Sequence, residues 1–288
     1  MTQPSKPSLF EGRWGIVLFG LLMGLGTFTL VLWGIPLDEV LGALGSAKIP
    51  WLLAMAGIFL VQQCIRAWRQ MIIIQGVVPE HRYMSSLSVL CIGFLFVNTL
   101  PARLGEMVRP LLLLEKEDIP MGTGLAMVFV ERIMDFLSML IMIAAVAWWV
   151  EVPQHSMVIG GRTIEWVQTG KTLAAIGTPV LLVVLLAILV GIRPLLAALE
   201  ALTNRHSNHR VAQMALPILK LGDHFATGLK VLQQPKRLFL ILVSTVATWT
   251  ISAFMFTTTA YAFGLGEHID FGAAIGLLAI VMLGMTIP

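Results

Sequence analysis

Charged residues are scarce in this chain. Only 12% of its 288 residues are Asp, Glu, Lys or Arg, whereas 57% are hydrophobic and the mean hydropathy is +0.87. A soluble domain usually carries about a quarter charged residues. A soluble core of this size could not cover so much apolar surface, so lipid must solvate much of the chain. The composition therefore predicts an integral membrane protein with no soluble domain large enough for separate chemistry.

Cysteine is also rare, and the motifs of cofactor enzymes are missing. Cys64 and Cys91 both lie in apolar runs, which excludes a disulfide framework or a cysteine metal site. Gly170-Lys171-Thr172 resembles the end of a phosphate-binding loop, but Glu165 stands where that loop needs glycine. We therefore expect no metal, no cofactor, no nucleic-acid partner and no enzymatic activity.

Long apolar runs dominate the sequence. They are continuous, whereas a membrane β-barrel shows alternating segments of about ten residues, so we predict an all-α, polytopic membrane helix bundle in a single domain over residues 1–288. About 20 apolar residues are needed to cross a bilayer. The run Trp14–Ile35 is too long for the apolar core of a signal peptide, and no cleavage site follows it. The predicted spans are Trp14–Ile35, Trp51–Ile74, Met121–Val150, Thr172–Ile192 and Leu238–Phe263.

Two shorter apolar runs, Met84–Leu100 and Phe271–Ile287, are predicted to be re-entrant, the second element ending at about residue 288. Cytoplasmic loops collect Lys and Arg, and this topology with a cytoplasmic N-terminus places 15 of the 19 basic residues inside. Both runs lead into a Thr-aliphatic-Pro sequence, which suggests an inverted repeat. We expect a multi-pass protein of the bacterial cytoplasmic (inner) membrane.

The inner stretch between the last two spans contains a further helical pattern. Apolar residues recur at helical intervals over residues 211–232, between Lys220, Asp223, His224 and Lys230. This pattern suits an amphipathic helix on the inner membrane surface. A connecting hairpin packed on the bundle explains it equally well.

The segment from Asn98 to Arg109 is predicted to break a helix within the membrane. Pro101 cannot continue the preceding helix but suits the first turn of the next. Asn98 or Thr99 can cap that second helix, whose free N–H groups and dipole favour an anion.

Three charged residues follow this break at intervals of three: Arg103, Glu106 and Arg109. They cluster on one side of the second helix, where forked arginine donors suit a phosphate. An interfacial charge ladder that anchors the helix end is the alternative.

A second charged group lies inside the third predicted span. Glu131 and Asp135 share a helix face, and Arg132 can pair with Asp135. Ionisable groups within a span normally face a cavity or one another. They either line a polar cavity with Arg103 and Glu106, or form a structural ion-pair knot.

Arg66, Trp68 and Arg69 lie near the inner end of the second predicted span. Long cationic side chains beside an interfacial tryptophan are typical of snorkelling anchors, and we prefer that interpretation. Arg66 and Arg69 as further cavity residues are the alternative.

These motifs resemble one known family. The sequence Asn98-Thr99-Leu100-Pro101-Ala102-Arg103-Leu104-Gly105-Glu106 with Arg109, followed by Glu131-Arg132 and Asp135, is similar to the lysylphosphatidylglycerol synthase transmembrane-region, or flippase-like, family. Arg66-Ala67-Trp68-Arg69 fits its pattern too, and the resemblance extends from about Trp14 to Pro288. Family members usually continue past the final proline with a Gly-rich turn and a glutamate, so we expect only half of the second re-entrant element here.

The resemblance implies re-entrant helices around a lipid-accessible polar cavity. Fused family members carry a cytosolic aminoacyl transferase domain, which this chain lacks, so it is not expected to be a synthase. We predict a lipid translocase for a phospholipid or an aminoacylated or lipid-linked headgroup. The alternatives are a membrane-embedded lipid transferase and a non-transporting accessory subunit of envelope lipid or glycan assembly. Expected partners are the lipid itself, further copies of the chain, or a separate cytosolic lipid-modifying enzyme.

Overall fold

The structure is a computed structural model that describes residues 22, 24–26, 29, 36–99, 105–149, 156–159, 162–205 and 209–286. This part of the chain is helical apart from one antiparallel hairpin, so the predicted all-α class is confirmed. The predicted span Trp14–Ile35 lies almost wholly outside it. The elements are α2 (Leu37–Ser46), α3 (Ile49–Ile74), α4 (Tyr83–Thr99), α5 (Val108–Glu117), α6 (Met121–Trp149), β1 (Ser156–Ile159), β2 (Arg162–Glu165), α7 (Trp166–Arg205), α8 (His209–Gly228), the 3-10 helix η2 (Leu229–Gln233), α9 (Pro235–Ala262) and α10 (Phe271–Thr286).

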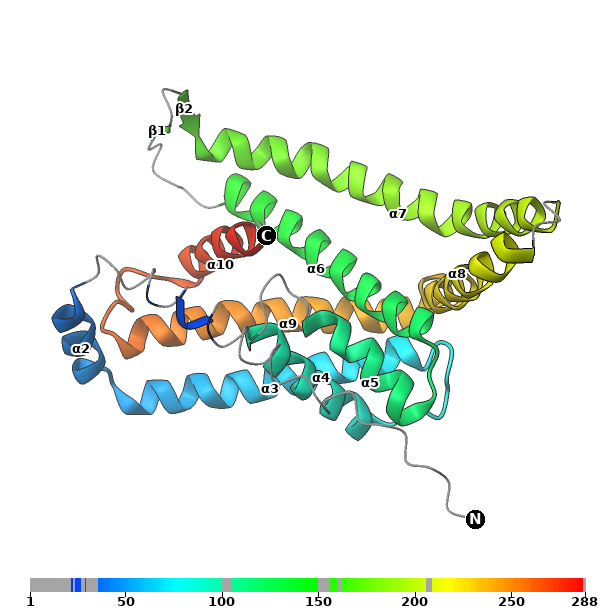
Figure 1. Cartoon of the computed structure of the whole chain (residues 1–288). Coiled ribbons are helices and arrows are strands. Elements are labelled where there is room, and N and C mark those ends of the chain that lie inside the picture. Colours follow the sequence, from blue (N-terminus) through cyan, green and yellow to red (C-terminus); the bar gives the residue numbers. More distant parts are fainter. Residues whose placement is uncertain are drawn as a thin grey trace, which may run out of the picture.

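Helices α3 and α9 run antiparallel along one another and form the base of the bundle (Figure 1). Contacts tie them together at both ends. Where α3 begins, the amide of Lys48 donates to the carbonyl of Ala262 at 2.9 Å, and the rings of Trp51 and Tyr261 stack. Where α3 ends, Arg237 donates to the carbonyl of Ile72 at 3.3 Å. The two helices are therefore fixed in register over their whole shared length.

Three helical segments are long and apolar enough to cross a membrane: Ile49–Ile74, Ala175–Ala201 and Pro235–Ala262. Each overlaps a span predicted from the sequence. A fourth predicted span coincides with α6, which has 29 residues and carries the charged group. The runs predicted as re-entrant form the short apolar helices α4 and α10, with 17 and 16 residues.

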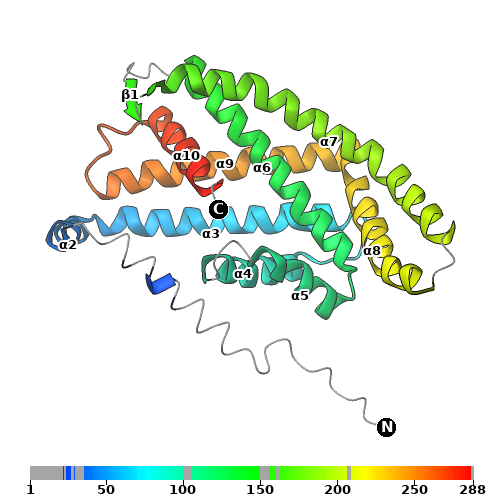
Figure 2. The ribbon, with the colours of Figure 1, turned by 45° about the horizontal axis from the view of Figure 1, so that its top comes forward.

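Helix α6 crosses the base and joins it to the other helices (Figure 2). Its first half supplies Ala126, Met127 and Val130 to the main core, which also includes Ile73 of α3 and Leu113 of α5. Its second half packs on α10, where Met139, Ile143 and Ala279 form a smaller apolar cluster. Helix α6 thus contacts the short apolar helix α10 and also α5, the helix that follows the short apolar helix α4.

The inner stretch differs from the prediction. Helix α7 was expected to end near Ile192, but it continues through Pro194 to Arg205. The residues after Pro194 are mostly Leu and Ala, strong helix formers that offset the one hydrogen bond lost at the proline. The helix expected over residues 211–232 is α8, which ends at Gly228 and is followed by η2.

Helix α8 packs against α6 and α7, and η2 buries Leu229 and Val231 in the main core. This packing favours the connecting-hairpin interpretation of residues 211–232. The hairpin of β1 and β2, paired from Ser156 with Glu165 to Ile159 with Arg162, lies in a segment for which no strand was predicted.

The close approach of α6 and α8 depends on Gly122. A Cβ atom at this position would lie 2.8 Å from both the Phe225 nitrogen and the His224 Cβ, closer than real side chains come, and would also collide with the Leu221 carbonyl. We predict that Gly122→Ala lowers the unfolding free energy in detergent by about 1–3 kcal/mol, the usual cost of overpacking. Thermal unfolding followed by circular dichroism measures it.

Gly191→Ala in α7 is the matched control, because a Cβ at Gly191 meets nothing within 4 Å. It should leave the midpoint unchanged or raise it slightly, since alanine is the better helix former. Equal midpoints for the two variants would contradict the predicted α6–α8 contact.

Candidate functional site: a buried cluster of ion pairs

The deepest charged residue of the cluster is Arg69 of α3. Its side chain is 1% exposed and contacts two other helices. One guanidinium nitrogen lies 3.1 Å from Asp135 Oδ1 on α6 and 3.1 Å from Thr245 Oγ1 on α9. Arg69 therefore joins three helices and does not snorkel to the membrane surface, so the anchor interpretation is wrong for this residue.

Arg109, at the start of α5, forms the second buried pair. Its Nη1 donates to Glu131 Oε2 on α6 at 2.7 Å, and its Nη2 donates to Gln70 Oε1 on α3. The side chain reaches these partners by crossing α4 at Gly93, where a Cβ atom would lie 2.7 Å from Arg109 Cδ. Glycine at position 93 thus leaves the space through which the guanidinium enters the bundle.

Arg132 completes the network at its more exposed edge. Its Nε lies 3.3 Å from Glu106 Oε2, and its Nη1 lies 3.7 Å from Asp135 Oδ2. The pairing of Arg132 with Asp135 predicted from their three-residue spacing is confirmed. The structure also brings Glu106 and Arg109 to the charged group of α6, as the sequence analysis expected.

The remaining cation of the cluster is Arg66, which is partly exposed on α3. Its charge interacts favourably with Asp135 and Glu131 and unfavourably with Arg69 and Arg109, so it lies among them. Within the described part of the chain it has no hydrogen-bond or ion-pair partner, whereas each carboxylate of the cluster has an arginine. Four arginines thus face three carboxylates: Arg66, Arg69, Arg109 and Arg132 against Glu106, Glu131 and Asp135.

The cluster has more hydrogen-bond donors than acceptors. Among the described residues, six buried side-chain nitrogens and one buried oxygen have no hydrogen-bond partner. A buried polar atom without a partner is costly and rare. The nitrogens are Gln63 Nε2, Arg69 Nε, Gln70 Nε2, Arg109 Nε, Arg132 Nε and Trp249 Nε1, and the oxygen is Glu131 Oε1. Arg132 Nε differs from the others, because it is in ion-pair contact with Glu106 without the geometry of a hydrogen bond. This excess of donors is chemically suited to an anion.

The helix break is less fully described. Pro101 and Arg103 lie outside the described residues, so their predicted roles stay predictions. Asn98 lies within α4 and donates to the carbonyl of Phe94 at 2.7 Å. The N-cap residue of α5 is Met107, which makes no side-chain capping bond, so neither Asn98 nor Thr99 is the N-cap of α5. Residues 100–104 lie outside the described part, so capping of a helix turn there stays a prediction.

A 3-10 turn at residues 105–107 precedes α5 and explains the glycine of the motif. A Cβ atom on Gly105 would collide with the backbone of Phe96 and Val97 in α4. Glycine therefore lets the returning chain lie directly against α4, which places Glu106 and Arg109 over α6.

The neutral polar residues of the site were not predicted from the sequence. Gln62 donates to the carbonyl of Thr248 at 3.3 Å and to the hydroxyl of Ser252, both on α9. Gln63 and Gln70 are also buried on α3, and Thr245 is buried on α9. Their signal was present: three glutamines and two arginines recur within nine residues of an otherwise apolar helix, and α9 repeats Ser and Thr at helical spacing.

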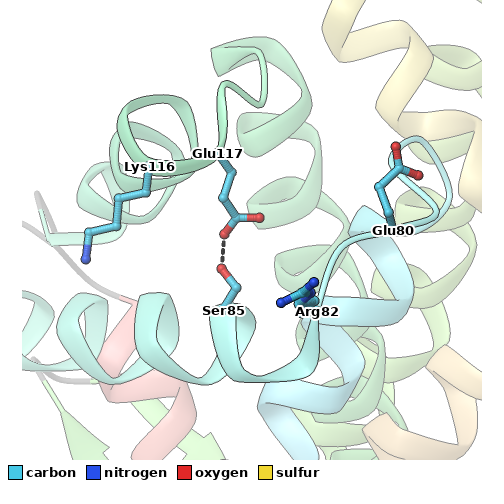
Figure 3. A pocket seen from close by; sticks show the side chains of 5 residues that line it. All are labelled: Glu80, Arg82, Ser85, Lys116 and Glu117. Atoms are coloured by element: carbon cyan, nitrogen blue, oxygen red, sulfur yellow. Dashed lines mark hydrogen bonds between the residues drawn. The ribbon is translucent and has the colours of Figure 1, made fainter.

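A separate polar group lies where α4 begins and α5 ends (Figure 3). It surrounds an open hollow of about 420 Å³ lined by Glu80, Arg82, Ser85, Lys116 and Glu117. Ser85 donates to Glu117, and buried His81 lies 2.7 Å from both Glu117 Oε2 and Ser86 Oγ. This resembles the order of a catalytic triad, but Ser86 is 0% exposed and cannot reach a substrate. The group instead ties the two ends of the α4–α5 hairpin together.

The comparison with known families covers nearly the whole chain. The family model described as the lysylphosphatidylglycerol synthase TM region matches residues 16–288. The chain belongs to this family. No curated protein and no solved structure matches it. Membership of the lysylphosphatidylglycerol synthase TM-region family places the chain among membrane proteins of lipid biosynthesis or translocation.

Within the lysylphosphatidylglycerol synthase TM-region fold, the ion-pair cluster is the site to consider first. In the described ranges, no group of three or more His, Cys, Asp or Glu side chains is placed to hold a metal ion. The cluster presents fixed guanidinium donors inside an apolar bundle, where charge–charge interactions are stronger than in water.

The pair of Arg109 and Glu131 is predicted to be strongly coupled. Removal of one partner leaves a buried, uncompensated charge, so Arg109→Met and Glu131→Leu should each lower the unfolding free energy by about 3–5 kcal/mol. The double variant should recover most of this loss, because both charges are gone. Unfolding by denaturing detergent, arranged as a double-mutant cycle, measures the coupling. Additive effects of the two substitutions would show that the pair is not buried from water.

Proposed function

We propose that this protein is a lipid translocase, which moves a lipid headgroup between the two leaflets. The observation that carries the proposal is the charged cluster, in which donors exceed acceptors between helices whose outer surfaces are apolar. Ionisable groups inside a membrane bundle are expensive and typically mark a substrate path. Family membership is consistent with this role, because it already limits the protein to lipid biosynthesis or translocation.

The barrier to lipid translocation is the transfer of a polar headgroup into hydrocarbon. The headgroup phosphate loses its hydration there, which costs several kcal/mol or more unless other donors replace water. The guanidinium groups of Arg66, Arg109 and Arg132 can supply those donors at fixed positions. Acyl chains remain outside, along apolar side chains such as Leu60 and Val61 of α3, which are 64% and 53% exposed.

We place the protein in the bacterial cytoplasmic membrane with its N-terminus inside, since this topology puts most basic residues in the cytoplasm. In this arrangement the hollow between α4 and α5 faces the cytoplasm. A separate cytosolic enzyme that makes or modifies the lipid could then deliver its product to the same leaflet.

The proposal predicts that purified protein translocates a headgroup-labelled phospholipid in liposomes without any partner. Asp135→Asn should lower the rate at least tenfold, because it removes the carboxylate that holds Arg69 and Arg132 in place. Accessibility of the label to a membrane-impermeant reductant measures the rate. Asp223→Asn, an exposed position on α8, is the matched control and should transport at the wild-type rate.

Two outcomes would favour the other functions. Mass spectrometry of the recovered lipid should show it chemically unchanged, and a new headgroup would instead indicate a transferase. Wild-type protein that is folded but inactive until a partner is added would indicate an accessory subunit. Asp135→Asn protein that is folded and fully active would remove the cluster from the transport path.

A further inference from the structure

The charge count of the cluster carries information about the headgroup. Asp135 is paired with Arg69, Glu131 with Arg109, and Glu106 with Arg132. Each carboxylate is thereby neutralised by one arginine, and Arg66 is the cation left without a carboxylate among the residues that the structure describes. The cluster carries one net positive charge among its described residues, inside a bundle where an uncompensated charge is unfavourable.

Arg66 lies on the same face of α3 as three residues that carry buried donors without partners. Gln63, Arg66 and Gln70 lie on one face of α3 at offsets of three and seven residues, and Arg69 follows Arg66 by three. Gln63 is 7% exposed and Gln70 is 0% exposed, and each has an amide nitrogen with no partner. Arg69 Nε is a third such donor on this helix. A guanidinium with several free N–H groups beside it is a suitable binding site for a phosphate oxygen.

The position of Arg66 favours a lipid over a soluble ion. It lies eight residues before the end of α3, or about 12 Å along the helix at 1.5 Å per residue. Arg66 is itself partly exposed, so its side chain is accessible from outside the bundle at this depth. A headgroup attached to acyl chains can reach such a position without leaving the bilayer.

We propose that Arg66 binds the phosphate of a lipid whose headgroup carries a net negative charge, with Gln63 and Gln70 as additional donors. This inference rests on the proposed translocase function and narrows its substrate class. The cluster disfavours an aminoacylated headgroup, because an ammonium group would have to displace an arginine from an existing ion pair. Glu131 Oε1, the one buried acceptor without a partner among the described residues, suits a neutral hydroxyl such as that of a glycerol headgroup.

The direct test is equilibrium binding of short-chain lipids to the purified full chain in a neutral detergent. Dioctanoyl phosphatidylglycerol should bind at least about tenfold more tightly than its lysyl ester or phosphatidylcholine, since only it has an unmatched negative charge. Arg66→Gln should remove this preference and leave phosphatidylcholine binding unchanged. Arg193→Gln, an exposed arginine of α7, is the matched control and should keep the preference.

Thermal unfolding provides a second measurement. Arg66→Gln removes an unpaired charge, so its midpoint without lipid should equal or exceed that of the wild type, whereas the rise caused by phosphatidylglycerol should disappear. A structural role for Arg66 would instead lower the midpoint without lipid. Inorganic phosphate at millimolar concentration should not compete, and competition would assign the site to a soluble anion and overturn the lipid assignment.

The binding and transport experiments separate the two proposals. Tight binding of phosphatidylglycerol that depends on Arg66, without any translocation, would refute the translocase function and leave the anionic site standing. Translocation that prefers the lysyl ester, or that Arg66→Gln leaves unchanged, would refute the anionic site and keep the translocase. Equal affinity for all three lipids would also overturn the proposed site.

Discussion

The arrangement of the bundle depends on the need to neutralise charge in a place without water. Among the described residues, three carboxylates and three arginines from α3, α5, α6 and the turn before α5 form buried ion pairs, and Arg66 lies beside them without a partner. Each pair joins different parts of the chain, so the helices cannot shift independently without exposing a charge to hydrocarbon. The α4–α5 hairpin is consequently held against α6 by Glu106 and Arg109, and α3 is held against α6 by Arg69. The same contacts that fix the fold also create the surplus of donors on which the proposed function depends.

The neutral polar contacts between α3 and α9 act differently. Gln62 bonds to α9 through a carbonyl and a hydroxyl, and Thr245 accepts from Arg69. The hydroxyls of Thr245 and Thr248 also donate to carbonyls one turn earlier in their own helix. They therefore stay satisfied when a partner on α3 is lost. Such contacts contribute less than about 2 kcal/mol each to stability in a membrane. Helices α3 and α9 can therefore shift relative to one another at a lower free-energy cost than the helices that the ion pairs join.

The sequence predicted most of the helices because long apolar runs have few other solutions in lipid. It also predicted that Glu106, Arg109, Glu131, Arg132 and Asp135 lie together, since charges within spans seek one another. It could not assign Arg66 and Arg69, because a cation near the end of a span has the same pattern whether it snorkels or pairs inward. The choice depends on Asp135, which is 66 residues from Arg69 along the chain. The sequence placed the start of the second helix near Pro101, which lies outside the described residues, whereas α5 begins at Val108, after the 3-10 turn at residues 105–107.

The inverted repeat suggested by the sequence stays a prediction, and the two halves that it relates differ in charge. A long apolar helix is followed by a short one in two pairs: α3 with α4, and α9 with α10. The two long helices, α3 and α9, are antiparallel. The two halves differ in charge, because the cluster draws its ionised groups from residues 66–135 and only neutral hydroxyls from α9. If the second half carried the same charges as the first, still more arginines would lie around the contact between α3 and α9. With charge in one half and hydroxyls in the other, Arg66 is the one arginine of the described cluster that has no carboxylate partner, and a guanidinium in this state can bind one phosphate.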